Sequence, residues 1–343
     1  MKKKMMAAFL CGTMVIGGLA GTVVSAEPVQ AAEETKIAWY APAPHPYFDE
    51  VKKGVEKFME EQDTEVIIQI GPDWTQASEN EKVEALVAQG VNAISIYPCD
   101  ASGANGLYEE ISEKMGVNVI NFGTDTAKPT TASFAVGTDV KQAAMDATEA
   151  LIEMMGGKGK ILNVLEVLED PNTALRKEGV EEVVAKYPDV EIIQEIAGIK
   201  TQEEAVSKIE SALSANVGEV NGIICTGMVT SVGMTQTLND YYAQQPDAEH
   251  IYTVGIDTDP TVMDGIEDGV IDATIAQNSA GHGYISCMAL KLMGEGYQVK
   301  DDQYFIDAGI VLVTKDNMDA YAEELDGVTE EILDKLTTDY LTK

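Results

Sequence analysis

Short, continuous apolar runs alternate with amphipathic stretches along most of the chain, and this alternation limits the possible folds more than any other feature. Unbroken apolar runs of this length are typical of parallel strands that are buried on both faces. The pattern therefore predicts an α/β fold in which parallel sheets are flanked by helices. The strand-like runs cover residues 36–41, 65–70, 92–97, 117–122, 160–165, 190–196, 222–226, 251–256 and 272–277.

Amphipathic stretches with helical spacing separate these runs, and a repeating strand–helix order gives right-handed crossovers. The predicted helices cover 47–62, 77–89, 104–114, 140–155, 175–186, 203–213, a stretch ending at 242, 262–267 and 282–293.

Three segments lack a helical pattern and predict crossings between two lobes: 123–139, 277–279 and 305–313. We therefore expect two Rossmann-like lobes joined by a three-segment hinge. Residues 33–137 and 278–306 are assigned to the N-terminal lobe. Residues 138–277 and 307–343 are assigned to the C-terminal lobe, which includes an acidic tail.

The N-terminus has the order of parts that is typical of a secretory signal peptide. Basic residues Lys2–Lys4 precede an apolar run, and small residues at Ala26 and Ala32 suit signal peptidase. The apolar run is shorter than the roughly 18 residues that a membrane span needs. We expect a signal peptide over 1–26, with cleavage at 32 and an uncleaved anchor as alternatives. The mature chain is then exported, to the periplasm or the outer face of the cytoplasmic membrane.

Residues 19–22, Leu-Ala-Gly-Thr, resemble a bacterial lipoprotein box in which Thr22 replaces the acylated cysteine. A hydroxyl group cannot form the thioether, and the residues before Cys11 fit such a box poorly. A soluble, unlipidated monomer is therefore favoured, and a lipoprotein stays as the alternative.

The formal net charge is −35, and it becomes −38 when the three lysines of the signal peptide are removed. This charge disfavours nucleic acid, whose binding proteins need clustered Lys and Arg. Familiar catalytic motifs such as G-x-S-x-G, H-E-x-x-H and C-x-x-C do not occur in the sequence. The three histidines lie far apart in sequence, without the spacing of a metal site. We therefore expect no enzyme activity, no metal and no cofactor.

Ligands bind open parallel sheets at the carboxyl ends of the strands. The residues that follow the predicted strands combine aromatic rings, carboxylates, an amide and Arg176, the one arginine of the chain. Sugars need this mixture, because rings cover their C–H faces while planar polar groups contact their hydroxyls. Each residue also has a plainer interpretation: Phe48 as core, Asp125 as a turn former, Arg176 as a surface residue. The candidates are Tyr47, Phe48, Thr124, Asp125, Arg176, Asp257 and Gln277.

At these residues the chain resembles the sugar-binding proteins of bacterial ABC importers, specifically the ribose, galactose and autoinducer-2 group with the type I periplasmic-binding-protein fold. The resemblance covers about residues 36–315. The matching stretches are HPYF (45–48), GPDWT (71–75), EALVAQGVNAISIYP (84–98), VINFGTD (119–125), NTALRKEGV (172–180), TVGIDT (253–258) and GVIDATIAQNSAGHGY (269–284).

The resemblance implies a role in ligand binding for most of the candidates, and of the residues 123–125 it carries over Asp125 alone. Tyr47 and Phe48 would sandwich the sugar ring, and His45 would touch its hydroxyls. Arg176 would bind ring or hydroxyl oxygens, with Asp257 and Gln277 completing the polar contacts.

The chain departs from the family pattern at two places. Gly123 stands where an acid is common, and Gly227-Met228 replaces a common Asn-Asp pair. An ordinary ribose or galactose pattern is therefore not expected, and the loss of polar groups favours a modified, deoxy or less polar ligand.

The resemblance implies a solute-binding protein that closes on its ligand and then docks on an ABC permease in the membrane. A ligand-sensing protein for chemotaxis or autoinducer signalling is the alternative, since it would use the same fold and pocket. A repressor with this core fold is disfavoured by the predicted signal peptide and the strongly acidic composition.

Overall fold

The computed structural model describes residues 35–168, 170–301 and 303–343. The predicted signal peptide and the sequence that resembles a lipoprotein box lie outside these residues. Within them, no helix is both long and apolar enough to cross a membrane.

The N-terminal lobe is built on a six-stranded sheet with the order β12-β5-β4-β3-β1-β2, in which every pair is parallel. Its elements are β1 (Ile37–Ala41), α1 (Pro46–Gln62), β2 (Val66–Ile70), α2 (Gln76–Ala88), β3 (Ala93–Ile96), α3 (Ala104–Glu109), a π-helical turn (Glu110–Lys114), β4 (Asn118–Phe122), β5 (Phe134–Gly137), α9 (Ser279–Gly294) and β12 (Phe305–Asp307).

The C-terminal lobe is built on a second six-stranded sheet with the order β13-β10-β9-β8-β6-β7. Only β13 runs antiparallel to its neighbour. Its elements are α4 (Val140–Met154), β6 (Gly159–Val164), α5 (Pro171–Val184), β7 (Val190–Ile196), α6 (Gln202–Ala215), β8 (Gly222–Cys225), α7 (Met228–Gln244), β9 (Tyr252–Ile256), α8 (Pro260–Asp268), β10 (Ala273–Gln277) and β13 (Ile310–Thr314).

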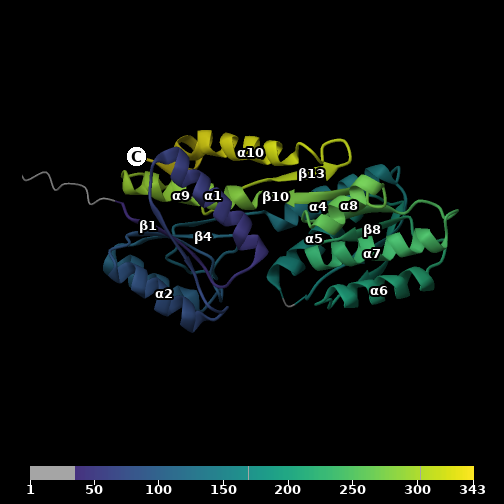
Figure 1. Cartoon of the computed structure of the whole chain (residues 1–343), viewed down its shortest axis with the longest axis horizontal. Coiled ribbons are helices and arrows are strands. Elements are labelled where there is room, and N and C mark those ends of the chain that lie inside the picture. Colours follow the sequence, from purple (N-terminus) through teal and green to yellow (C-terminus); the bar gives the residue numbers. More distant parts are fainter. Residues whose placement is uncertain (1–34, 169, 302) are drawn as a thin grey trace, which may run out of the picture. The chain divides into compact units, whose positions relative to one another are not determined.

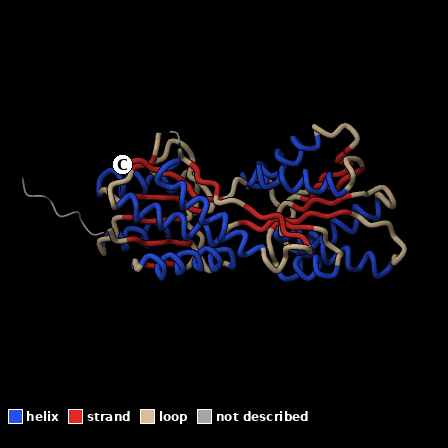
Figure 2. Tube along the Cα trace, turned by 90° about the horizontal axis from the view of Figure 1, so that it is seen from above, coloured by secondary structure: helices blue, strands red, loops and turns tan. Residues whose placement is uncertain are grey.

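This architecture confirms the predicted fold class of two α/β lobes with mostly parallel sheets. In each lobe the strands form a layer between helices (Figure 2). In the N-terminal lobe α1 packs against α9 (Figure 1). The apolar strand residues fill separate cores on the two faces of each sheet, as continuous apolar strands require.

Helix α5 begins four residues earlier than the apolar spacing predicts. Pro171 occupies its first turn, where a missing N–H costs nothing. Asp170 caps the helix by accepting a hydrogen bond from the N–H of Asn172 at 3.1 Å. Arg176 therefore lies in the second turn of the helix.

Three crossings connect the two sheets, and hydrogen bonds from both backbone and side chains link them to one another. The N–H of Ala308 donates to the carbonyl of Gly137 at 2.8 Å. The side chain of Asn278 donates to the carbonyl of Ala308 at 2.8 Å. The N–H of Asp139 donates to the carboxylate of Asp307 at 3.1 Å. These contacts hold the three predicted hinge segments side by side.

The acidic tail differs from its assignment to the C-terminal lobe. It contains α10 (Tyr321–Lys335), a π-helical turn (Leu336–Tyr340) and β14 (Leu341–Thr342), which pairs with β11 (Gln298–Val299). Ile332, Leu336 and Leu341 are buried in the core of the N-terminal sheet. Burying each such side chain stabilises the fold by roughly 1.5–3 kcal/mol. The end of the tail is therefore part of the N-terminal lobe.

Candidate functional site

Aromatic side chains gather at the carboxyl edge of the N-terminal sheet. Phe48 lies at their centre, with its ring centroid 5.0 Å from that of Tyr97 and 5.3 Å from that of Trp74. Phe48 is only 1% exposed, whereas Trp74 is 45% exposed. Phe48 is thus the support of this aromatic cluster, and Trp74 presents an open ring to solvent.

His45 lies at the rim of the aromatic cluster. It caps α1, because its Nδ1 atom accepts a hydrogen bond from the N–H of Tyr47 at 3.1 Å. Its exposed ring lies 5.8 Å from Phe48 and 6.3 Å from Trp74, measured between centroids. The cap fixes the ring beside the exposed face of the cluster.

Tyr47 is held by a hydrogen bond of 2.8 Å between its hydroxyl group and Nδ1 of His282. Nε2 of His282 contacts the hydroxyl of Thr138, 3.3 Å away in the first hinge crossing. Burial lowers the pKa of His282 to about 4 and raises the pKa of Tyr47 well above its usual value. Both side chains are therefore neutral near pH 7.

Gly123 explains why the acid expected at this position is absent. A β-carbon there would overlap the hydroxyl oxygen of Tyr47 and lie 3.0 Å from the ring of Tyr97. The backbone of Gly123 also has a φ of +72°, which favours glycine. Tyr47 therefore occupies the space that a side chain at position 123 would need.

Asp125 lies in a local network outside the aromatic cluster. Its Oδ1 accepts hydrogen bonds from the hydroxyl of Tyr304 at 2.7 Å and from the N–H of Thr126 at 2.6 Å, and Lys128 lies 3.4 Å from its other oxygen. These contacts agree with the interpretation of Asp125 as a turn former. Its neighbour Thr124 is half-buried and forms no hydrogen bond within the part of the chain that the structure describes.

Asp257 and Gln277 meet at the carboxyl edge of the C-terminal sheet. The side-chain amide of Gln277 donates a hydrogen bond to the carboxylate of Asp257 at 2.6 Å. Asp257 has a φ of +75°, which is uncommon for a residue with a side chain. Such strain is frequent at binding sites. Burial raises the pKa of Asp257, and both the Gln277 bond and the nearby charge of Arg176 oppose that rise.

Arg176 forms no hydrogen bond or ion pair with any of the described residues. Its side chain is half-buried, and its Nε atom is buried without a partner. The guanidinium interacts electrostatically with Asp257, but without a direct contact. A buried N–H group that lacks a partner costs free energy, so a ligand that accepts hydrogen bonds would be favoured here.

The two halves of the site influence one another electrostatically. The charge of Asp257 acts on Tyr47, and the charge of Arg176 acts on Tyr97. The structure therefore brings together six of the predicted residues: the rings of His45, Tyr47 and Phe48 in the N-terminal lobe, and Arg176, Asp257 and Gln277 in the C-terminal lobe.

Sequence reasoning missed three residues at this site: Trp74, Tyr97 and Glu166. Tyr97 follows β3 directly, at the end of the apolar run 92–97, and Trp74 lies in the loop after β2, four residues beyond its end, so the same strand-end rule points to both. Glu166 follows β6 by two residues, and burial raises the pKa of its carboxyl group. The sequence signal for Glu166 was weaker, because we searched for candidates near the start of the following helix, which begins five residues later at Pro171.

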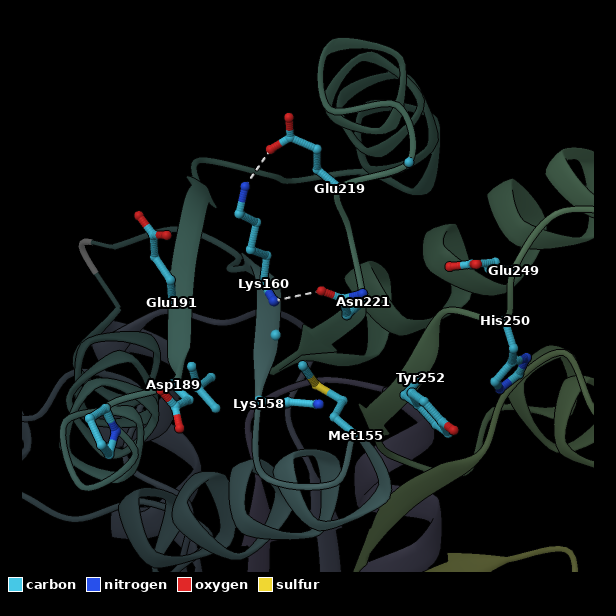
Figure 3. A pocket seen from close by; sticks show the side chains of 14 residues that line it. Met155, Lys158, Lys160, Asp189, Glu191, Glu219, Asn221, Glu249, His250 and Tyr252 are labelled. Atoms are coloured by element: carbon cyan, nitrogen blue, oxygen red, sulfur yellow. Dashed lines mark hydrogen bonds and ion pairs between the residues drawn. The ribbon is translucent and has the colours of Figure 1, made fainter.

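A hollow of about 950 Å³ lies away from these residues, at the amino ends of the C-terminal strands (Figure 3). Lys160 and Glu219 form an ion pair there, and the backbone N–H of Lys160 donates to the side chain of Asn221 at 2.9 Å. None of the predicted site residues lines it. Because ligands of open parallel sheets bind at the carboxyl ends of strands, this hollow is not the candidate site.

No group of three or more His, Cys, Asp or Glu side chains suited to a metal ion occurs among the described residues.

Comparison with known proteins places these features in context. The family profile described as "Periplasmic binding protein domain" matches residues 40–298. A xylitol-binding protein of Mycolicibacterium smegmatis is 24% identical over 262 residues, which is 76% of this chain and 71% of that protein. A D-apiose import binding protein of Actinobacillus succinogenes is 30% identical over 137 residues, 40% of this chain and 42% of that protein.

Solved structures show the same fold at low sequence identity. The arabinose-binding protein AraP of Geobacillus stearothermophilus has a TM-score of 0.73 and 20% identity, covering 84% of this chain and 99% of that chain. A periplasmic ribose ABC transporter protein of Conexibacter woesei has a TM-score of 0.74 and 18% identity, covering 86% of this chain and 98% of that chain.

Proposed function

The chain belongs to the periplasmic binding protein family, and from this premise we propose that it captures a neutral sugar or polyol outside the cytoplasm and delivers it to an ABC permease. Its relatives are named as binding proteins, and the titles of several structural neighbours name solute-binding proteins of ABC transporters. The proposal includes export by the predicted signal peptide and an unlipidated, monomeric mature chain.

The observation that carries the proposal is the guanidinium of Arg176, which has no hydrogen-bond partner among the described residues and acts electrostatically on Tyr97 of the aromatic cluster. Its fork donates hydrogen bonds in one plane, a geometry that matches adjacent oxygens of a sugar. Asp257, oriented by Gln277, supplies acceptors for hydroxyl groups. The open ring of Trp74 and the half-buried ring of Tyr47 supply apolar faces for the C–H surface of the ligand.

The charges at the site favour a neutral ligand. The charge of Arg176 acts on Asp257 and on Glu166, and no other cationic side chain of the described residues acts on either carboxyl group, whereas Asp170 and Asp257 add negative charge near Glu166. A phosphate or carboxylate on the ligand would add a further negative charge to a partly desolvated group of acids. Sugar phosphates and sugar acids are therefore expected to bind more weakly than neutral analogues.

The relatives narrow the chemistry of the ligand. Their names and solved complexes mention xylitol, D-apiose, ribose, D-arabinose, D-allose and myo-inositol. All of these are neutral, hydroxyl-rich molecules of five or six carbons. We use them as the test panel for this chain.

Capture would proceed by closure of the two lobes. The three crossings would act as the hinge, because they connect the two sheets and are hydrogen-bonded to each other. Rings from one lobe and polar groups from the other would then cover the ligand from both sides. The closed form would dock on the permease.

A thermal-shift screen of the mature protein against this panel tests the proposal. A ligand at about 100 times its Kd should stabilise the fold by roughly 2.7 kcal/mol. At least one neutral sugar or polyol is expected to raise the melting temperature, and the corresponding sugar phosphate should not. If no carbohydrate shifts the melt while another class of solute does, the proposal is wrong.

A further inference from the structure

The space in front of Gly227 is filled by the carboxyl group of Glu166, which lies in the loop after β6. A β-carbon on Gly227 would overlap the carboxyl carbon and Oε1 of Glu166. The backbone of Gly227 is extended, with a φ of −162°, so any residue could adopt it. Glycine is therefore needed at this position for space rather than for conformation.

Glu166 is fixed in this position by its backbone and by one carboxylate oxygen. Its carbonyl accepts a hydrogen bond from the N–H of Gly198 at 2.9 Å. Its Oε1 accepts the N–H of Val229 at 3.1 Å, in the first turn of α7. Gly227 itself provides no side-chain cap for that helix, and a carboxylate at a helix N-terminus is favourable.

The second carboxylate oxygen of Glu166 has no hydrogen-bond partner among the residues that the structure covers. The neighbouring charges that act on the group are Arg176, which stabilises the carboxylate, and Asp257 and Asp170, which oppose it. Burial raises its pKa, so the fold keeps a carboxyl group where ionisation is disfavoured. Groups placed at such a cost are frequent at functional sites.

We propose that Glu166 contacts the ligand and determines its specificity, with its free oxygen accepting a hydrogen bond from one hydroxyl group of a neutral sugar or polyol. It takes the place of the polar side chain that Gly227 lacks. This inference rests on the proposed function. It also changes the expectation drawn from the sequence: position 227 does not make the pocket apolar, and an analogue that lacks this hydroxyl is discriminated against.

The test is titration calorimetry with the panel member that raises the melting temperature of the wild type most. The variants are Glu166→Gln, Glu166→Ala, Gly227→Ala and the double variant Glu166→Ala/Gly227→Ala. Glu219→Gln is the matched control, because Glu219 is an exposed carboxylate at the opposite edge of the same sheet (Figure 3). Arg176→Ala reports on the proposed site as a whole.

Removal of a charged acceptor is expected to weaken binding by about 10- to 100-fold in both Glu166 variants, and the control should match the wild type. Gly227→Ala should also weaken binding, because its methyl group displaces the Glu166 carboxyl group. In the double variant the two losses should not add, since both remove the same contact.

Deoxy analogues of the same ligand, each lacking one hydroxyl, separate direct contact from a structural role. One analogue should bind the wild type at least about tenfold more weakly than the parent ligand. Glu166→Ala should bind that analogue and the parent ligand with nearly equal affinity. A purely structural role would weaken both ligands equally and preserve their ratio.

The outcomes distinguish this inference from the proposed function. If the wild type binds a panel ligand and Arg176→Ala weakens binding, but Glu166→Gln and Glu166→Ala bind within twofold of the wild type, Glu166 is not a ligand contact. An unchanged ratio for every deoxy analogue in Glu166→Ala overturns the inference as well. If the wild type binds no panel ligand, the proposed function fails and the inference fails with it.

Discussion

Gly123 offers a sharp test of how the aromatic half of the site is built. Gly123→Ala places a methyl group against the hydroxyl of Tyr47, whose hydrogen bond to His282 is 2.8 Å long. Gly116 is a matched control, because its φ is also +72° and no atom lies within 4 Å of the position of its β-carbon. The left-handed backbone costs alanine about 1 kcal/mol at both positions, and this cost cancels in the comparison.

The difference between the two variants measures the displacement of Tyr47. Loss of the hydrogen bond to His282 contributes about 1 kcal/mol, and the shift of a packed ring adds a similar amount. Gly123→Ala should therefore lower the free energy of unfolding by about 1–2 kcal/mol more than Gly116→Ala does. Since Tyr47 faces the proposed ligand, its affinity should also fall, by roughly 5- to 30-fold, while Gly116→Ala leaves the affinity unchanged.

Urea unfolding monitored by fluorescence gives the stabilities, and calorimetry gives the affinities. In a Tyr47→Phe background, which removes the overlapping hydroxyl, most of the extra cost of Gly123→Ala should disappear. Equal losses of stability in Gly123→Ala and Gly116→Ala would refute the reasoning, because Tyr47 would then not be held against Gly123.

Three further predictions concern the charge, the pH dependence and the fluorescence of the site. Because the pKa of His282 falls to about 4 in the fold, the unfolded chain binds more protons between pH 6.5 and 4. The unfolding free energy should fall there with decreasing pH by up to about 1.4 kcal/mol per unit, and a His282→Gln variant that keeps the same pH slope would contradict this. Burial raises the pKa of Asp257, so its buried charge is unfavourable for the fold. Asp257→Asn should therefore raise the melting temperature of the unliganded protein at pH 7 and weaken ligand binding about tenfold. An unchanged melting temperature together with an unchanged affinity would count against the proposed role of Asp257. Trp39 is fully buried and Trp74 is 45% exposed, so ligand should change the emission of Trp74. Persistence of the whole change in Trp74→Phe would show that it arises at Trp39 and would contradict this prediction.

The strand–helix pattern was enough to predict the fold class, because each strand is buried on both faces and leaves an unbroken apolar run. The run 190–196 matches β7 at both ends. The start of α5 was predicted four residues late, since Pro171 and the cap at Asp170 carry no apolar periodicity. The end of the tail was assigned to the wrong sheet, because a local pattern does not show which distant core will bury Ile332 and Leu336.

The strand-end rule works best for residues at the very end of a strand: Asp257 follows β9 directly and Gln277 ends β10, and the two side chains form a hydrogen bond. The two glycines that depart from the family pattern could not be interpreted from sequence alone. In the structure, Tyr47 fills the space at Gly123, and Glu166 fills the space at Gly227. Both side chains come from other parts of the chain, so only the three-dimensional arrangement relates them to the missing groups.

The central claim is that Arg176 binds the oxygens of a neutral sugar or polyol. Calorimetric titration of wild type and Arg176→Ala with the best ligand of the panel tests this claim most directly. We predict a loss of affinity of roughly 100-fold or more, because two hydrogen bonds to a charged group are removed. The melting temperature of the unliganded variant should stay near that of the wild type, since Arg176 has no hydrogen-bond partner among the described residues. Binding of the variant within twofold of the wild type would contradict the account.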